Sequence, residues 1–345
     1  MYTGDMKRPT LRDIAEIAHV SHVTVSLALR KHRSIPARTR KRIEEIARQI
    51  GYRPDPALSA LMVYRRGAKP SSYQPTLAWI NFSKRSSGGD FLLYYLGAQE
   101  RCAELGYHLE EFSLLDVSFE RLAKILYVRN IQGIIIGPPD HEHTRISTRC
   151  INWDQFSAVT FGFRLAKPKL HTITNAQFHS ARIAVRKLRS LGYRRIGYAS
   201  TREFNQSTEG NFLGGFLYEQ LHWPLAEHVP VLAPPEKDLV PECRKWFSLY
   251  KPSAIFTVHF GVLSALTPEE IRNSGIAMHE LPEDLSIFAG IQQNGRLIGR
   301  AAVDEVVALV HSNQRGIPAA PKRILIEGCW CDGLSAPRIT ARAQR

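Results

Sequence analysis

The chain has 345 residues, of which 44% are hydrophobic, so it can form one small domain and one or two domains of ordinary size. Its formal net charge is +14, and the first 70 residues carry +9 of this, with 15 Lys and Arg against 6 Asp and Glu. No segment approaches 18 consecutive apolar residues, which excludes a membrane-spanning helix, and a concentrated basic region suits binding to phosphates.

Residues 10–30, TLRDIAEIAHVSHVTVSLALR, predict two short helices joined by a tight turn. Thr10 stands where an N-cap is expected, and apolar residues follow it at helical spacing over 14–18. The pattern is interrupted over 19–21, where Ser21 can cap a second helix with its own apolar stripe. Such short helices bury little surface by themselves, so we expect them to pack against a third.

Residues 36–50, PARTRKRIEEIARQI, predict that third helix. Pro36 is placed for a first helical turn, and Gly51 follows at the expected stop. The apolar residues of this segment share one helix face and are Ile43, Ile46, Ala47 and Ile50. The three helices together predict a small helix-turn-helix head.

This head, followed by GYRPDPALSAL, resembles the N-terminal region of the lac-repressor (LacI/GalR) family of transcription regulators. The chain carries the family's Thr-Leu, Asp-Ile-Ala, Ala-x-Val-Ser and Thr-Val-Ser elements at the family's spacing. The resemblance implies a sequence-specific DNA-binding protein, most often a dimeric repressor.

A recognition helix places its N-terminal side chains against base edges in the major groove, and the resemblance assigns this role to His22, Val23 and Leu27. His22 can bond to a purine edge, whereas Val23 and Leu27 offer apolar contact to a thymine methyl. Small hydroxyls suit phosphates. The DNA-binding residues that we predict in the head are Leu11, Ser21, His22, Val23, Thr24, Ser26, Leu27, Arg30, Thr39 and Tyr52.

The segment after the head predicts a hinge helix. Asp55 can cap it, Pro56 fits a first helical position, and residues 57–63 allow one or two turns, too few to be stable alone in water. In the family this helix folds on the operator and inserts a leucine into the minor groove. Leu61 matches that leucine, with Met62 beside it; the alternative is that these residues dock on the large domain.

Beyond a Pro- and Ser-containing linker, short apolar strands alternate with amphipathic helices. The predicted strands are 76–82, 133–137, 194–200, 254–258 and 285–290, and the predicted helices are 91–105, 180–192, 212–221 and 296–313. Such alternation predicts α/β architecture with doubly wound parallel sheets covered by helices.

Two runs in this region also resemble the family, namely SARIAVRKLRSLGYRRIGYAS and LPEDLSIFAG. The resemblance implies a core of two subdomains like those of periplasmic sugar-binding proteins, with a ligand cleft between them. We therefore expect a head over 1–53, a hinge and linker over 54–75, and a core over 76–345. The two discontinuous subdomains are predicted to be 76–174 with 293–322, and 175–292 with 323–345.

The core departs from the sugar-binding members of the family. These members carry an Asn-Asp pair where this chain has His259 and Phe260. They carry an Arg at the position of Phe212 and an Asp at the position of Gln292, and Ala176-Gln177 replaces a further Asp-Asn. Sugars are held by such polar groups, so a simple pentose or hexose is not expected. Either the cleft binds a bulkier effector or it is an unliganded scaffold; the candidate effector residues are Phe91, Phe212, His259, Phe260 and Gln292.

Catalytic and metal-binding motifs are absent from the sequence. It contains no G-x-G-x-x-G after the first core strand, no G-x-x-x-x-G-K-[ST] and no G-x-S-x-G, so we expect neither an enzyme nor a cofactor. The pair His141 and His143 lacks an evident third ligand, and Cys329-Trp-Cys331 lacks a second pair. We interpret all five cysteines as reduced thiols; the others are Cys102, Cys150 and Cys243.

The sequence thus favours a cytoplasmic, homodimeric transcription regulator that binds near-palindromic duplex DNA, with a small-molecule effector and no membrane partner. A periplasmic binding protein is the rival class, but the basic head and the start MYTGDMKRPT, which lacks an apolar run, argue against it. Repression and activation, and inducer and corepressor, are left open by the residues.

Overall fold

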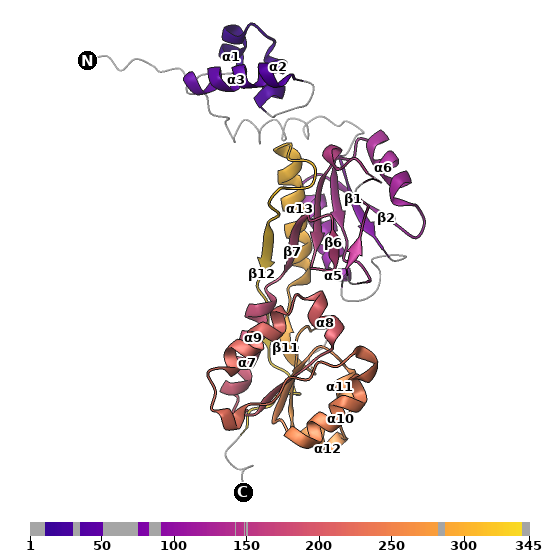
Figure 1. Ribbon diagram of the computed structural model, residues 1–345, viewed down its shortest axis with the longest axis vertical. Coiled ribbons are helices and arrows are strands. Elements are labelled where there is room, and N and C mark those ends of the chain that lie inside the picture. Colours follow the sequence, from indigo (N-terminus) through magenta and orange to yellow (C-terminus); the bar gives the residue numbers. More distant parts are fainter. Residues whose placement is uncertain are drawn as a thin grey trace, which may run out of the picture.

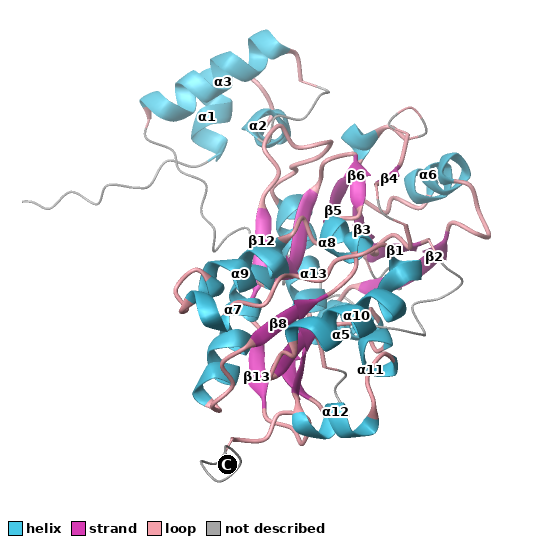
Figure 2. Ribbon diagram, turned by 60° about the horizontal axis from the view of Figure 1, so that its bottom comes forward, coloured by secondary structure: helices cyan, strands magenta, loops and turns pink. Residues whose placement is uncertain are grey.

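The computed structural model describes residues 11–29, 35–50, 75–82, 91–141, 143–147, 149, 151–281 and 287–339. It contains a helical head followed along the chain by two α/β units (Figure 1). In each unit the helices lie on both sides of the strands (Figure 2). The predicted fold class, a helix-turn-helix head with a doubly wound α/β core, is confirmed.

The head consists of the three predicted helices. They are α1 Leu11–Ala18, α2 His22–Leu29 and α3 Ala37–Gln49. Because none is long enough to be stable in isolation, they share one small apolar core. Its buried members are Ile14, Ala15, Ala18, Val25, Ala28, Ile35, Ile43 and Ala47.

The first α/β unit is built on a six-stranded parallel sheet with the order β12-β7-β5-β3-β1-β2. Helices cover both faces, so a central strand such as β3 (Gly-Ile-Ile-Ile) is buried throughout. The strands are β1 Thr76–Asn81, β2 His108–Ser113, β3 Gly133–Ile136, β5 Ser157–Phe161, β7 His171–Asn175 and β12 Arg323–Ile326. The other elements are α5 Leu92–Glu104, α6 Phe119–Val128, α13 Gly295–His311, η1 Trp153–Gln155 and the paired β4 Thr144–Arg145 and β6 Leu165–Lys167.

Helices α5 and α13 cross very closely on one face of this sheet. A Cβ at Gly97 of α5 would lie 2.0 Å from the carbonyl oxygen of Arg296, and one at Gly299 of α13 would lie 1.9 Å from that of Tyr94. Glycine is therefore required at both crossing points, and the contact attaches the late helix α13 to the early part of the chain.

The second unit has a five-stranded sheet with the order β13-β11-β10-β9-β8, in which only β13 is antiparallel. The strands are β8 Ile196–Ala199, β9 Ala254–Thr257, β10 Gly275–Met278, β11 Ala289–Gln292 and β13 Cys329–Cys331. The helices are α7 Gln177–Ser190, α8 Arg202–Ser207, α9 Asn211–Gln220, α10 Leu239–Tyr250, α11 Gly261–Ser264, α12 Pro268–Asn273, η2 Leu225–Glu227 and η3 Glu236–Asp238. Residues of α7 and α9 pack on one face, and those of α10 to α12 on the other.

Two sequence expectations need correction. Residues 323–345 were expected in the second subdomain, but β12 pairs with β7 in the first sheet, and only β13 joins the second. We also expected only a helical stretch between 258 and 285, whereas β10 lies there after two short helices. Both strands have four residues, and a run this short carries no signal for the sheet that it joins.

The chain therefore passes between the two units three times, after β7, after β11 and after β12. Hydrogen bonds join these segments. The amide of Ala176 donates to the carbonyl of Ile326 over 2.8 Å, and Asn294 Nδ2 donates to the carbonyl of Glu327 over 2.7 Å. The Glu327 carboxylate also pairs with His179 at the start of α7. We call this group of residues, Ala176, His179, Asn294, Ile326 and Glu327, the crossing cluster.

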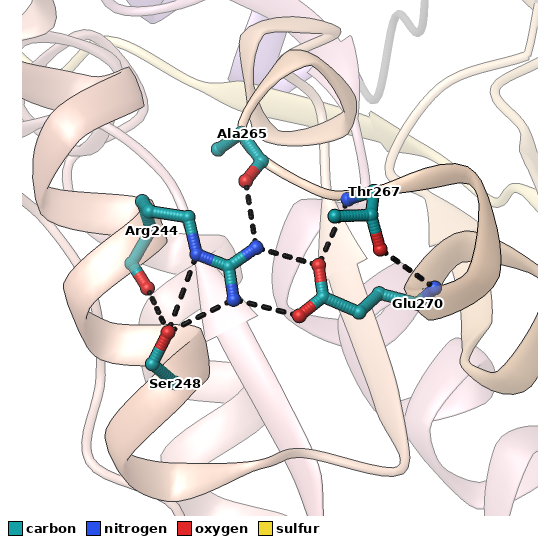
Figure 3. A network of polar contacts seen from close by, with 5 residues as sticks. All are labelled: Arg244, Ser248, Ala265, Thr267 and Glu270. Atoms are coloured by element: carbon teal, nitrogen blue, oxygen red, sulfur yellow. Dashed lines mark hydrogen bonds and ion pairs between the residues drawn. The ribbon is translucent and has the colours of Figure 1, made fainter.

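A second polar network joins α10 to α12 (Figure 3). Arg244 donates to both carboxylate oxygens of Glu270, over 2.5 and 2.6 Å, and to the carbonyl of Ala265. Glu270 in turn completes a capping box with Thr267 at the start of α12. Hydrogen bonds from Arg244 lower the pKa of Glu270 to about 2, with further bonds from Thr267 acting in the same direction.

Glu270→Gln should lower the melting temperature at neutral pH, because it removes the charged partner of Arg244. The folded-state pKa of Glu270 lies below its ordinary value of 4.5, so its stabilising effect is complete above about pH 4.5 and is lost as the pH falls toward 2. The difference in melting temperature between variant and wild type should shrink over that range. Glu242→Gln is the control, because Glu242 forms an exposed pair with Lys245, three residues further along α10. An equal effect of both variants would contradict the role of the network.

Candidate nucleic-acid interface

The turn between α1 and α2 is built by three residues. His19 adopts a left-handed conformation with φ 48°, which ends α1, and the amide of Val20 donates to the carbonyl of Ala15 over 3.1 Å. Ser21 then caps α2, since its Oγ accepts the amide of Thr24 over 3.1 Å. The sequence expectation of a turn followed by a serine cap is confirmed.

The position of α2 is set from its buried side. Val25 and Ala28 lie in the head core, and Arg42 of α3 donates to the carbonyl of Ala18, the last residue of α1. Since the apolar side faces inward, the first turn of α2 presents polar groups outward. Ser21 and His22 are exposed, and the Thr24 hydroxyl lies 2.9 Å from Ser21 Oγ.

The predicted DNA-binding residues differ in how much of each side chain is exposed and available for contact with DNA. Leu11 and Leu27 are half-buried and pack against the head core, so only part of each side chain is available for contact, and Thr39 is also half-buried. Val23 and Ser26 lie on α2, but their side chains are outside the described part of the chain. Arg30, Tyr52, Asp55, Leu61 and Met62 are also outside it.

Sequence reasoning overlooked the exposed cations of α3. Arg38 and Lys41 are both exposed on that helix. They contribute to the positive charge of the first 70 residues, and that charge was the sequence feature from which phosphate-binding residues on this helix could have been predicted. Such groups can bind phosphates without reading bases.

The five candidate effector residues are spread over both units. Phe212 and His259 are close to each other, because both rings contact Phe204, at 5.8 and 5.6 Å between centroids. His259 Nε2 also lies 3.4 Å from Thr201 Oγ1. Phe212, however, is only 3% exposed, so it belongs to the core of the second unit.

The other three candidates make separate contacts. Phe91, at the start of α5, lies against Tyr94 and Arg164. Phe260 is 53% exposed and contacts Phe288 edge to face. Gln292 ends β11 and contacts the thiols of β13. The structure therefore brings together Phe212 and His259 but does not bring the five into one described pocket.

His279 is a buried polar residue that sequence reasoning overlooked. It follows β10 directly, is fully buried, and is stacked 4.7 Å from Phe212, while its ring nitrogens make no well-formed hydrogen bond within the described residues. Burial lowers its pKa well below the usual value, with nearby His259 acting in the same direction, so the ring is neutral at physiological pH. His259 is shifted downward by burial too.

Two hollows in the described part of the chain are lined by other residues. One is open and is lined by Glu203, Pro235, Glu236 and Lys237. The other lies between the loop after β5 and the start of β12, and its lining includes Lys169, Glu209 and Arg323. Neither includes a candidate effector residue.

Over the described ranges, no group of three or more His, Cys, Asp or Glu is placed to hold a metal ion. No helix in these same ranges is both long and apolar enough to cross a bilayer. Cys102, Cys243, Cys329 and Cys331 are free thiols, and Cys150 lies outside the described residues.

The described chain combines a capped helix-turn-helix head with two doubly wound α/β units. Residues 10–55 match the sequence model described as bacterial regulatory proteins, lacI family. The head is therefore similar to that of the lacI family over these residues, as the sequence resemblance predicted.

The chain is also 30% identical over 103 residues to the probable HTH-type transcriptional repressor ExuR of Bacillus subtilis (strain 168). That match covers 26% of this chain and 30% of the length of the relative.

Solved structures with the same fold extend the likeness to the core. The lac repressor dimer bound to operator and the anti-inducer ONPF has a TM-score of 0.56 at 17% identity, over 96% of this chain and 100% of that one. A complex of the transcriptional regulator CelR with cellobiose has a TM-score of 0.55 at 17% identity, over 95% and 100%. A putative lacI-family regulator from Rhizobium etli has a TM-score of 0.57 at 14% identity, over 77% and 100%.

Two substitutions at Ser21 should separate its cap from its position near DNA. Ser21→Ala removes the acceptor for the Thr24 amide and should destabilise the head by about 1 kcal/mol, seen as faster hydrogen exchange of α2 amides. Ser21→Asp keeps an acceptor at the helix N-terminus, so exchange should stay slow, but its charge should repel phosphates and weaken duplex binding. Wild-type duplex affinity of Ser21→Asp would show that this end of α2 does not approach DNA.

Proposed function

We propose that this protein is a homodimeric repressor that binds a near-palindromic operator, with one α2 in the major groove of each half-site. The observation that carries the proposal is the capped α1–turn–α2 unit, in which Ser21 and His22 are exposed while Val25 and Ala28 are buried in the head core. A twofold dimer presents two identical helices to adjacent grooves. A solved structure of similar fold is the lac repressor dimer bound to operator, which supports the proposal.

Base reading is assigned to His22, Val23 and Leu27, and phosphate contacts to the hydroxyls of Ser21, Thr24, Ser26 and Thr39. His22 is exposed at the start of α2, which supports its role. The proposed hinge wedge, Leu61 with Met62, lies outside the described residues and rests on the sequence resemblance alone. Since chromosomal DNA is the proposed partner, we assign the protein to the cytoplasm.

Regulation is proposed to work through the angle between the two core units. A small molecule bound between them would shift that angle, alter the spacing of the paired hinges and change operator affinity. Solved structures of this fold with cellobiose or ONPF support a small-molecule effector in the core. A carbohydrate-related or other catabolic operon is the proposed target.

The contact chemistry of the core differs from that of the family's sugar-binding members, because His259 and Phe212 replace charged and amide groups. Their common contact with Phe204 supports a bulkier, partly aromatic ligand. The burial of Phe212 supports the second candidate, a regulator whose core is a scaffold without an effector. No observation favours a periplasmic binding protein, and the family match of the head argues against it.

His22→Ala and Thr39→Ala should weaken DNA binding in different ways. His22→Ala removes a base-reading side chain, so it should weaken the binding free energy for the preferred site by about 1–3 kcal/mol and relax selectivity at one base pair of each half-site. Loss of a phosphate contact should weaken all sequences to the same degree. Selection from randomised duplexes, followed by titration at several salt concentrations, measures both effects. An unchanged preferred site with His22→Ala would contradict its assignment.

Common monosaccharides should not raise the melting temperature of the protein. A ligand at 100 times its Kd stabilises a folded protein by about 2.7 kcal/mol, so even modest binding would be visible in a thermal shift assay. The family's charged and amide groups are missing at residues 212, 259, 260 and 292, which removes most hydrogen bonds to sugar hydroxyls. A clear shift with a pentose or hexose would contradict this and would show that other residues hold it.

A further inference from the structure

Two cysteines lie on the same side of the edge strand β13, around a single oxygen atom. Cys329 pairs with Gln292 of β11, and Cys331 pairs with Gly290. The thiols of Cys329 and Cys331 donate to the same atom, Gln292 Oε1, over 3.8 and 4.0 Å. Trp330 points to the other face, where it packs against the core formed with α7.

The backbone of β13 nearly allows these two sulfur atoms to bond. Residues two apart in a strand have Cα atoms about 6.6 Å apart. Disulfides join Cα atoms separated by roughly 4.4–6.8 Å and most often by about 5.5–6 Å, so this spacing lies at the upper end of the range and a local shortening of the strand relaxes the bond. A disulfide formed under such strain is more easily reduced than a relaxed one, which makes it reversible.

We propose that Cys329 and Cys331 form a reversible intrachain disulfide when the protein meets a hydroperoxide, and that this bond controls the conformation of the core. Pairs of this kind in intracellular proteins are usually transient and redox-sensing rather than structural. The regulatory part rests on the proposed function, whereas the chemical part does not.

The reaction uses the hydroperoxide as its oxidant. Deprotonated Cys329, which is the exposed thiol, attacks one peroxide oxygen. The O–O bond breaks, giving a sulfenic acid on Cys329 and an alkoxide that takes up the thiol proton. Cys331 sulfur then attacks Cys329 sulfur, the S–S bond forms, the S–O bond breaks, and the hydroxyl leaves as water with the Cys331 proton. Two thiols are oxidised, and one hydroperoxide is reduced to an alcohol and water.

The burial of the four described cysteines favours reaction of Cys329 first and Cys331 second. Burial, and to a lesser extent Cys329, raises the pKa of Cys331, which suits a thiol that acts second. Burial alone raises the pKa of Cys102 to about 12, and burial raises that of Cys243 to about 11 despite Arg244. Those two thiols are buried and protonated, so they should not react.

The same bond would affect the crossing cluster. β13 begins two residues after Glu327, whose carbonyl accepts from Asn294 and whose carboxylate pairs with His179. Shortening β13 would break its pairing with β11, and β11 ends at Gln292, just before the second chain crossing. Two of the three crossings would therefore change together, and this would change the angle between the two units.

The chemical step can be tested by peptide mass spectrometry on the full-length protein treated with hydrogen peroxide. The tryptic peptide 324–338 holds both cysteines of the pair and no other. It should lose two hydrogen masses and regain them with dithiothreitol, while the peptides with Cys102 and Cys243 stay unchanged. Cys331→Ser should instead leave a sulfenic acid on Cys329 that dimedone traps. Overoxidation of Cys329 or cross-linking between chains, without the intrachain bond, would overturn the proposal.

The regulatory step is tested by the Kd for a selected duplex before and after oxidation. Oxidation should change this Kd on the order of tenfold, dithiothreitol should restore it, and Cys329→Ser and Cys331→Ser should show neither effect. An unchanged Kd in protein that carries the disulfide would overturn the regulatory step. Failure of the reduced protein to bind any duplex would instead refute the proposed function, and the mass change would still decide the chemistry.

Discussion

Three short chain segments pass between the two α/β units, and the rest of the core depends on how they are held. Glu327 is central to them, because its carbonyl and its carboxylate contact residues from the other two segments. A backbone hydrogen bond between Ala176 and Ile326 joins two of the segments directly. A ligand or modification that alters the orientation of the units can act through these bonds, and the ion pair of Arg323 with Glu209 gives a further link between the units.

The head follows a different physical principle from the core. Its helices have 8, 8 and 13 residues, and the buried residues that they share make each depend on the other two. The core units have full sheets covered on both faces and large separate cores. Since head and core are stabilised independently, changes at the recognition helix and in the core can alter binding and control separately.

The sequence predicted those parts of the fold that have strong local signals. The serine cap, the interrupted helical pattern and the buried run of β3 each appear where expected. The short strands β10 and β12 could not be placed, because sheet membership depends on contacts distant in sequence. β12 joins the first sheet through pairing with β7, some 150 residues earlier in the chain.

A candidate site residue could be predicted from the sequence only where the local sequence also determines whether its side chain is exposed. His22 is exposed because the cap fixes where α2 begins, and this follows from local sequence. Leu27 and Phe212 show the limit of such reasoning, since each packs against a core whose other members come from distant residues. His279 gave no signal, because its burial results from rings contributed by several separate elements.

His279, which is buried, and His259, which is half-buried, also bear on how the core can respond to a signal. Burial lowers the pKa values of His259 and His279, so both rings favour the neutral form, which has one donor and one acceptor nitrogen. Aromatic contact and the crossing cluster are two routes by which this core can respond. The thiols of β13 act on the crossing cluster through Gln292, which ends the strand leading into one crossing. Because that route needs no ligand between the units, the core can respond although it carries Phe212, His259, Phe260 and Gln292 in place of charged and amide groups.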